Sequence, residues 1–266
     1  MIVRQAANVL DLLEFFVRRR QPATLSEIAD SLGWPRSSTF NLIQTLVDRG
    51  YLYEPRPRSG YYPSPRWLSL AQHVAAAEPL PEFAPALVGE LSAETGETAA
   101  IGAPAGINAI FVDVHESPAV VRYFAQVGHR LPIHATSTGR ALLAQYTREE
   151  RVALYRRIEF RQWSPTTPLS VDAVEAELQH AAERGYHQSL ADFSPDLAGV
   201  ALPLPVGDRR LSVVVAGPMF RMLDRLASVA EVIRRAIKRH AASPDAGKPP
   251  SQAETAVVRL KQQSSG

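Results

Sequence analysis

Hydrogen-bonding side chains gather on one side of a segment close to the N-terminus. Helical spacing over residues 36–48 predicts a buried apolar stripe made of Phe40, Ile43, Leu46 and Val47. The outward side carries short or flexible polar groups, with no acid before Asp48, namely Arg36, Ser37, Ser38, Asn41, Gln44 and Thr45. Hydroxyls and free N–H groups at a helix start bind phosphate oxygens, the role expected of Ser37, Ser38 and Thr39. Arg36, Asn41 and Gln44 are long enough to reach base edges in a DNA groove.

A second polar cluster lies in the middle of the chain. Thr136, Ser137 and Thr138 precede Gly139 at the predicted start of a helix. Their hydroxyls, the free N–H groups and the positive end of the helix dipole converge on one point, which suits a carboxylate. The simpler interpretation is N-terminal capping of the helix, and the residues alone favour it.

The sequence lacks the residue arrangements that most enzymes use. Its seven histidines form no His-x-x-x-His pair, and zero cysteine excludes thiol catalysis and cysteine zinc sites. It contains no nucleophile elbow, phosphate-binding loop or dinucleotide-binding glycine motif. Asp113 and His115 fall on one face of a predicted strand, where an exposed polar edge explains them better than a catalytic pair. We expect a protein that is not an enzyme and uses no cofactor or metal.

Three predicted helices position the polar side of residues 36–48. Apolar spacing indicates a first helix over residues 9–17. Thr24 stands three residues before Glu27, the spacing of a capping box, so a short second helix begins there and stops at Gly33. The turn that follows leads into the third helix. Helix, short helix, tight turn and longer helix is the order of a helix-turn-helix.

A basic hairpin is predicted directly after the third helix. Two short aromatic strands enclose a loop with Arg56 and Arg58, which we expect along the DNA backbone or in the minor groove. Residues 1–77 hold nine arginines against six acids, whereas residues 78–242 hold 17 basic and 19 acidic side chains. These features favour a winged helix-turn-helix that contacts DNA. The alternative is an amphipathic helix pair whose serines act only as caps.

The remaining pattern predicts a linker helix at residues 67–77, a disordered tail at residues 243–266 and an α+β domain between them. Its helices are expected at residues 83–94, 138–145, 147–157, 171–184 and 221–241. Its strands are expected at residues 98–103, 108–114, 120–125, 200–205 and 211–216.

Length and composition set the outer limits. A chain of 266 residues can form two domains, each with its own core. No stretch approaches the roughly 18 apolar residues of a membrane span, and the N-terminus lacks the pattern of a secretory signal. Together with the absence of cysteine, this predicts a cytoplasmic protein with no membrane partner.

Two sets of motifs resemble one family. The N-terminal set consists of LSEIA (25–29), GWPRSST (33–39) and LVDRGYL (46–52). The downstream set consists of GHRLPIHATSTGRALLA (128–144), GY (185–186), ALPLP (201–205) and VAGP (215–218). In this order and spacing, the chain resembles the isocitrate lyase regulator (IclR) family of bacterial transcription factors over roughly residues 3–241.

The resemblance implies a domain plan and a set of contacts. It implies a winged helix-turn-helix domain at 1–63, a linker helix at 64–78 and a GAF-like α+β effector-binding domain at 79–242. The expected partners are double-stranded DNA, a small-molecule effector and a second copy of the chain, with pairing of dimers into tetramers left open. The effector contacts that it implies are Ser137, Thr138, Gly139, Asp192, Val214 and Ala216.

Three departures from the family pattern refine these expectations. Only Asp192 remains of an acidic pair common in the family, and Val214 and Ala216 replace small hydroxyl residues. A less polar pocket follows, and so does a small carboxylic acid with a hydrophobic or aromatic body as effector. Asn41 replaces a residue that is commonly basic, so one phosphate anchor is lost. The alternative function is a GAF-type sensor whose N-terminal domain binds a protein instead of DNA.

Overall fold

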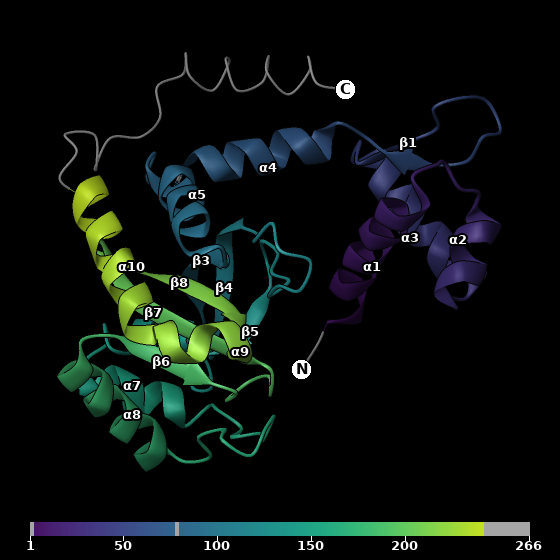
Figure 1. The fold of residues 1–266 in the computed structure, drawn as a ribbon. Helices are drawn as coiled ribbons and strands as arrows, with labels where there is room; N and C mark the ends of the chain where they lie inside the picture. Colours follow the sequence, from purple (N-terminus) through teal and green to yellow (C-terminus); the bar gives the residue numbers. More distant parts are fainter. Residues whose placement is uncertain (1–2, 78–79, 242–266) are drawn as a thin grey trace. The chain divides into compact units, whose positions relative to one another are not determined.

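The computed structural model describes residues 3–77 and 80–241 (Figure 1). The chain divides into two compact units, Met1–Pro79 and Leu80–Gly266. The predicted disordered tail at 243–266 lies outside the described residues. Within the described residues, no helix is long and apolar enough to cross a membrane.

The N-terminal unit begins with the predicted helix order. Its helices are α1 (Arg4–Arg19), α2 (Leu25–Leu32) and α3 (Arg36–Asp48). Thr24 and Glu27 form the predicted capping box, in which each side chain accepts a hydrogen bond from the other residue's backbone N–H. Gly33 ends α2 in the left-handed conformation, with φ +66°. The helix-turn-helix is confirmed.

Burial within α3 differs from the prediction by one residue. Thr39 is buried together with Ile43 and Leu46, whereas Phe40 is 49% exposed. The Thr39 hydroxyl donates to the Pro35 carbonyl at 3.0 Å, so its polarity is satisfied inside the core and its methyl can pack there. The expected position of Phe40 in the buried stripe is therefore wrong.

A short wing follows α3. Strands β1 (Leu52–Tyr53) and β2 (Tyr62–Pro63) pair antiparallel, and the loop between them carries Arg56 and Arg58. Gly60 is required at its position, because a Cβ there would lie 2.3 Å from the Ala23 backbone. The next helix, α4 (Arg66–Ala77), is anchored by the Trp67 indole N–H, which donates to the Tyr51 carbonyl at 2.9 Å.

The C-terminal unit is built on a six-stranded sheet with the order β5-β4-β3-β8-β7-β6. Every neighbouring pair is antiparallel. The strands are β3 (Thr98–Ala105), β4 (Asn108–His115), β5 (Arg130–Pro132), β6 (His187–Leu190), β7 (Leu197–Val206) and β8 (Arg209–Pro218). The α+β class is confirmed.

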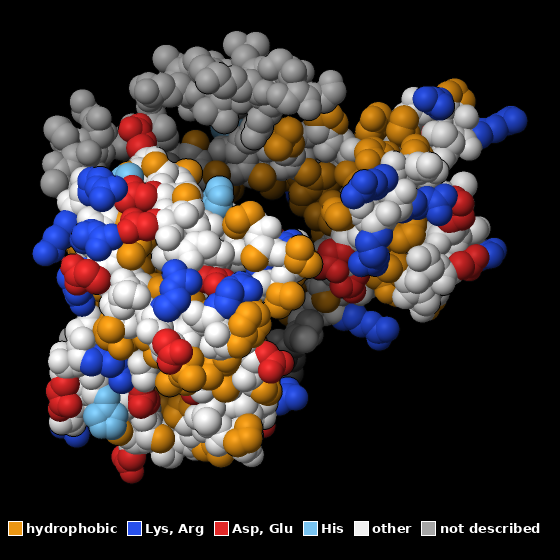
Figure 2. Space-filling view, in the orientation of Figure 1, with side chains coloured by type: hydrophobic (Ala, Val, Ile, Leu, Met, Phe, Trp, Pro, Cys, Tyr) orange, Lys and Arg blue, Asp and Glu red, His pale blue; other side chains and the backbone are white. Residues whose placement is uncertain are grey.

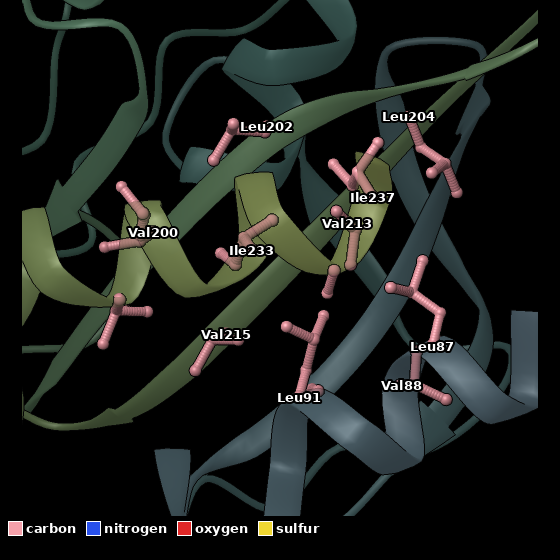
Figure 3. Packing of buried hydrophobic residues seen from close by; sticks show 14 of the residues in the cluster. Leu87, Val88, Leu91, Val200, Leu202, Leu204, Val213, Val215, Ile233 and Ile237 are labelled. Atoms are coloured by element: carbon pink, nitrogen blue, oxygen red, sulfur yellow. The ribbon is translucent and has the colours of Figure 1, made fainter. Parts of the chain in front are cut away.

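Helices cover both faces of this sheet. One face packs against α5 (Ala84–Thr95) and α10 (Leu226–Ala241), as Figure 3 shows. The other face packs against α6 (Ser137–Leu143), α7 (Arg148–Tyr155) and α8 (Val171–Arg184). Alternation along β8 divides the side chains, with Val213 and Val215 toward α10 and Val214 and Ala216 toward α6.

Two predicted elements of this unit are wrong. Residues 120–125 form no strand, because the backbone carbonyls of Val121 and Tyr123 accept hydrogen bonds from the side chains of Arg221 and Thr98. The single helix expected at 221–241 is divided into α9 (Met219–Met222), a 3-10 turn at Leu223–Arg225, and α10.

Candidate nucleic-acid interface and candidate ligand pocket

The outward side of α3 is open to solvent. Arg36, Ser37, Ser38, Asn41 and Gln44 are all exposed, as expected of residues that contact a nucleic acid. Within the described residues, no side chain caps the start of the helix at Pro35, so the N–H groups of its first turn stay available to phosphate oxygens.

Two predicted contacts in α3 need revision. Thr39 is 1% exposed, and its hydroxyl donates to Pro35, so its side chain cannot reach a phosphate. The Gln44 amide donates to the Asp48 carboxylate at 2.7 Å and must leave that partner before it contacts a base. Asn41 is exposed, and within the described residues no hydrogen bond occupies its side-chain amide.

The wing loop presents two cations. Ser59 fixes its turn, because the Ser59 hydroxyl donates to the Arg56 carbonyl at 2.8 Å and accepts from the Arg56 N–H at 3.2 Å. Among the described residues, no acid forms an ion pair with Arg36, Arg56 or Arg58, whereas Arg19 in α1 pairs with Glu27. Figure 2 shows arginine side chains standing out from the visible face of the N-terminal unit. This surface suits a polyanion.

A pocket lies beside the sheet face that packs against α6. It encloses about 400 Å³ of space not filled by atoms, its open mouth included. We call it the hydroxyl pocket because five of its lining residues carry hydroxyls outside aromatic rings, namely Thr136, Ser137, Thr138, Ser189 and Ser194. Its aromatic lining consists of Phe111, Tyr123 and Phe193. None of the described residues that line it is charged.

Four of the six predicted effector contacts line this pocket, namely Ser137, Thr138, Val214 and Ala216. Gly139 does not, and its role is steric, since a Cβ there would lie 2.1 Å from the Ile133 carbonyl oxygen. Asp192 does not line the pocket either. Its carboxylate accepts a hydrogen bond at 2.6 Å from Arg140, a residue that is 1% exposed. Asp192 neutralises a buried cation, and an effector contact of its carboxylate stays a prediction.

The three hydroxyl residues at the start of α6 have different roles. Thr136 is the N-cap, because its hydroxyl accepts from the Gly139 N–H at 3.1 Å. In the described part of the chain, no hydrogen bond engages the side-chain hydroxyl of Ser137 or Thr138. Both residues are at most 3% exposed and line the pocket, so their hydroxyls are free to bind a ligand there.

The sequence prediction missed the aromatic side of the pocket. Tyr123 lies in the irregular 117–125 segment and contacts Phe111 edge to face at 6.4 Å between ring centroids. Burial raises the pKa of Tyr123 to about 12, so its phenol keeps a proton to donate. Residues 120–125 were expected to form a strand, and irregular segments show no periodicity, so no pattern indicated that Tyr123 and Phe193 lie at the pocket. The alternation of β4 could have indicated Phe111.

The salt bridge between Glu97 and Arg221 helps to hold the 117–125 segment over the pocket. Both oxygens of the Glu97 carboxylate accept from Arg221, at 2.6 and 2.8 Å, and Arg221 also donates to the Val121 carbonyl at 2.8 Å. The Thr98 hydroxyl donates to the Tyr123 carbonyl at 2.7 Å. These bonds fix the backbone on both sides of Arg122 and so position the Tyr123 ring.

Beyond the pocket, half-buried aromatic rings surround the buried His134. The His134 ring lies 5.0 Å from Phe160 and 5.4 Å from Trp163, and Trp163 contacts the pocket residue Phe193. Burial lowers the pKa of His134 to about 4. Within the described residues, no three metal-binding side chains come together.

Both units match family models. A model of the IclR helix-turn-helix domain matches residues 5–56. A model of the C-terminal domain of IclR bacterial transcriptional regulators matches residues 72–241.

Individual relatives span most of the chain. The transcriptional repressor AllR of Salmonella paratyphi A is 26% identical over 230 residues, which cover 85% of each chain. The crystal structure of IclR from Thermotoga maritima superposes with a TM-score of 0.67 at 18% identity, covering 88% of this chain and 98% of its own. The structure of an IclR homologue from Microbacterium hydrocarbonoxydans in complex with 4-hydroxybenzoate gives 0.64 at 21% identity, covering 88% and 99%.

Proposed function

Because the chain belongs to the IclR family of bacterial transcriptional regulators, we propose that it binds its operator as a homodimer and releases or retains it according to a small carboxylic acid. Members of this family bind DNA and small-molecule effectors and are not enzymes. The observation that carries the proposal is the exposed outward side of α3, together with two unpaired arginines on the wing within the described residues.

The proposed DNA contacts divide by chemistry. Ser37 and Ser38, at the uncapped start of α3, bind phosphate oxygens, and Arg56 and Arg58 follow the backbone or minor groove. Arg36, Asn41 and Gln44 read base edges in the major groove. Sequence preference then comes from α3, whereas most salt-dependent affinity comes from the wing.

The homodimer follows from the small footprint of one reading helix. A single α3 contacts a few base pairs, so a useful site needs two copies on a pseudo-palindrome with half-sites about one helical turn apart, or a multiple of that. Helix α4 supports this, since none of its residues is buried, and Leu68 and Leu70 are 62% and 45% exposed. We propose residues 1–63 as the DNA-binding domain, 64–78 as the dimerising linker helix and 79–242 as the effector domain.

The proposed effector is a small carboxylic acid with an aromatic body. Phe111, Tyr123 and Phe193 offer ring faces and edges, and Ser137 and Thr138 offer unengaged hydroxyls to a carboxylate. The homologue that binds 4-hydroxybenzoate supports the same chemical class. Because no charged residue of the described chain lines the pocket, hydroxyl donors must hold the carboxylate, and moderate affinity is expected. The effector changes DNA binding by favouring one arrangement of the paired domains.

A selection from genomic DNA tests the proposal. Purified full-length protein is mixed with sheared DNA of its source at two salt concentrations, and retained fragments are sequenced. A few intergenic fragments that share an inverted repeat are expected, with binding that falls steeply with salt. Repeating the selection with benzoate-type acids and with aliphatic acids should change retention for the aromatic set.

The rival function is a sensor whose N-terminal unit binds a protein. It predicts no duplex retention at either salt concentration, with or without acids. That result would contradict the proposed function.

A further inference from the structure

One large apolar side chain stands on the exposed part of α3. Phe40 is 49% exposed and is not one of the buried or half-buried residues that form the N-terminal hydrophobic cluster of the described chain. Within the described residues, no aromatic or cation–π contact involves its ring. Isolated exposed apolar residues are common on protein surfaces, so the position of Phe40 decides its meaning.

That position is the N-terminal half of α3, among the residues expected to face DNA bases. Phe40 lies four residues from both Arg36 and Gln44, so these three side chains are neighbours on successive turns. Gln44 is held by Asp48, one turn further toward the C-terminal end of the helix. The Phe40 ring is therefore the apolar element of an otherwise polar surface.

We propose that Phe40 recognises a thymine by packing against its C5-methyl group in the major groove. The thymine methyl is the apolar group that base pairs present in that groove, and a phenylalanine side chain makes this contact well. The burial of both apolar groups on binding supplies the driving force. This inference rests on the proposed DNA-binding function and adds one specificity-determining residue to it.

Replacement of thymine by deoxyuridine tests the proposal directly. Deoxyuridine removes only the methyl group and keeps the Watson–Crick edge. The thymines of the selected operator are replaced one symmetric position at a time, with the equivalent thymine of both half-sites changed together. The Kd of the full chain for each modified operator is measured at one fixed salt concentration. Two equivalent contacts are lost at one symmetric position, so we expect about 15-fold weaker binding there, equivalent to ~0.8 kcal/mol for each of the two methyl carbons.

Variants assign that methyl group to a residue. Phe40→Ala should bind the thymine and deoxyuridine operators equally, whereas Phe40→Leu should keep part of the difference. Phe220→Ala is the matched control, because Phe220 is a 76% exposed phenylalanine of the C-terminal unit, and it should keep the full difference. Circular dichroism verifies that each variant is folded.

Two results would overturn the inference while leaving the proposed function intact. In the first, the wild-type protein binds its operator, yet every thymine tolerates the replacement within twofold. In the second, Phe40→Ala retains the sensitive position. A complete lack of duplex binding by the wild-type protein would instead overturn the proposed function, and the inference with it.

Discussion

At the scale of single residues, substitutions of the wing arginines and of the outward residues of α3 should affect DNA binding in different ways. Arg56→Ala removes from each protomer a cation without an acidic partner in the described chain, so affinity should fall for all duplexes and the salt slope of the dimer should decrease by about two. Asn41→Ala should instead change the preferred bases. Titration of specific and random duplexes at several salt concentrations measures both effects.

Arg18→Ala is the control for Arg56→Ala. Arg18 is an exposed arginine on α1 that pairs with Glu14 at 3.8 Å, and its loss should leave the salt slope unchanged. If Arg56→Ala and Asn41→Ala both bind duplexes like the wild type, the winged-helix contacts proposed above are wrong.

The hydroxyl pocket gives a second prediction at this scale. Thr138→Val keeps the shape of the side chain but removes an unengaged hydroxyl, so the affinity for an aromatic acid should fall by about two- to tenfold, the value of one hydrogen bond. Operator affinity without acid should not change. Isothermal titration with benzoate-type acids, alongside operator binding, measures the two quantities.

Thr136→Val provides the contrast. Its hydroxyl caps α6, so this variant should lower the free energy of unfolding by about 1 kcal/mol and affect ligand binding less. Equal acid affinity in Thr138→Val and the wild type would exclude the Thr138 hydroxyl as a ligand contact.

The exposure of a single residue could be predicted from the sequence where its polarity alone determines whether it is buried. The outward polar residues of α3 were predictable because nothing in the core competes for them. The burial predicted for Thr39 and Phe40 is the reverse of the burial observed. The helix packs in a rotation that buries the threonine, with its hydroxyl bonded to the Pro35 carbonyl. The structural roles of Gly139 and Asp192 could not be predicted, since only the folded chain shows how close Ile133 and Arg140 come.

At the scale of elements, a helix or strand could be predicted where the local sequence signals agreed with the packing or pairing partners that the fold provides. Capping boxes located the starts of α2 and α7, and Gly33 located the end of α2. Residues 120–125 have strand-forming composition, yet β5 occupies the edge of β4 and no strand pairs with them. Strand β6 was missed because its four residues, His187–Leu190, give little periodic signal.

The Glu97–Arg221 pair provides a prediction for the 117–125 segment. Glu97 is 1% exposed, so Arg221→Met leaves a buried carboxylate unpaired and should lower the free energy of unfolding by about 3 kcal/mol. It also frees the Val121 carbonyl, so the Tyr123 side of the pocket should loosen and acid affinity should fall several-fold. Urea unfolding and acid titration measure these two effects.

Arg122→Met is the matched control within the same segment. The side chains of Arg122 and its partner Glu116 are each about one-third exposed. This pair should therefore contribute at most about 1 kcal/mol to the free energy of unfolding. Similar losses in Arg221→Met and Arg122→Met would contradict a special role for the buried pair.

At the scale of the whole molecule, two buried histidines should make stability depend on pH. Burial lowers the pKa of His134 and of His187 to about 4, from the ordinary value of 6.5. Between pH 4 and pH 6.5 the unfolded chain binds more protons than the folded chain. The free energy of unfolding therefore has its full value above pH 6.5 and falls as pH decreases toward 4. Each histidine contributes up to about 3 kcal/mol to this loss. Urea unfolding at pH 7 and pH 5 should show it.

His134→Leu isolates one of the two contributions. The leucine cannot be protonated, so the loss of stability between pH 7 and pH 5 should decrease. An unchanged pH slope in His134→Leu would show that other groups cause the acid sensitivity.

The proposed assembly through α4 is a property of the whole molecule, and the proposed operator recognition depends on it. Leu68→Glu places charge on an exposed apolar position, so the proposed homodimer should dissociate while each unit remains folded. Affinity for the complete operator should then fall to that for a single half-site, and inserting five base pairs between half-sites should weaken the wild type but not the variant. Sedimentation and operator titration measure both. Val152→Glu, at a 40% exposed position on α7, is the control, and equal effects of the two variants would remove α4 as the dimer contact.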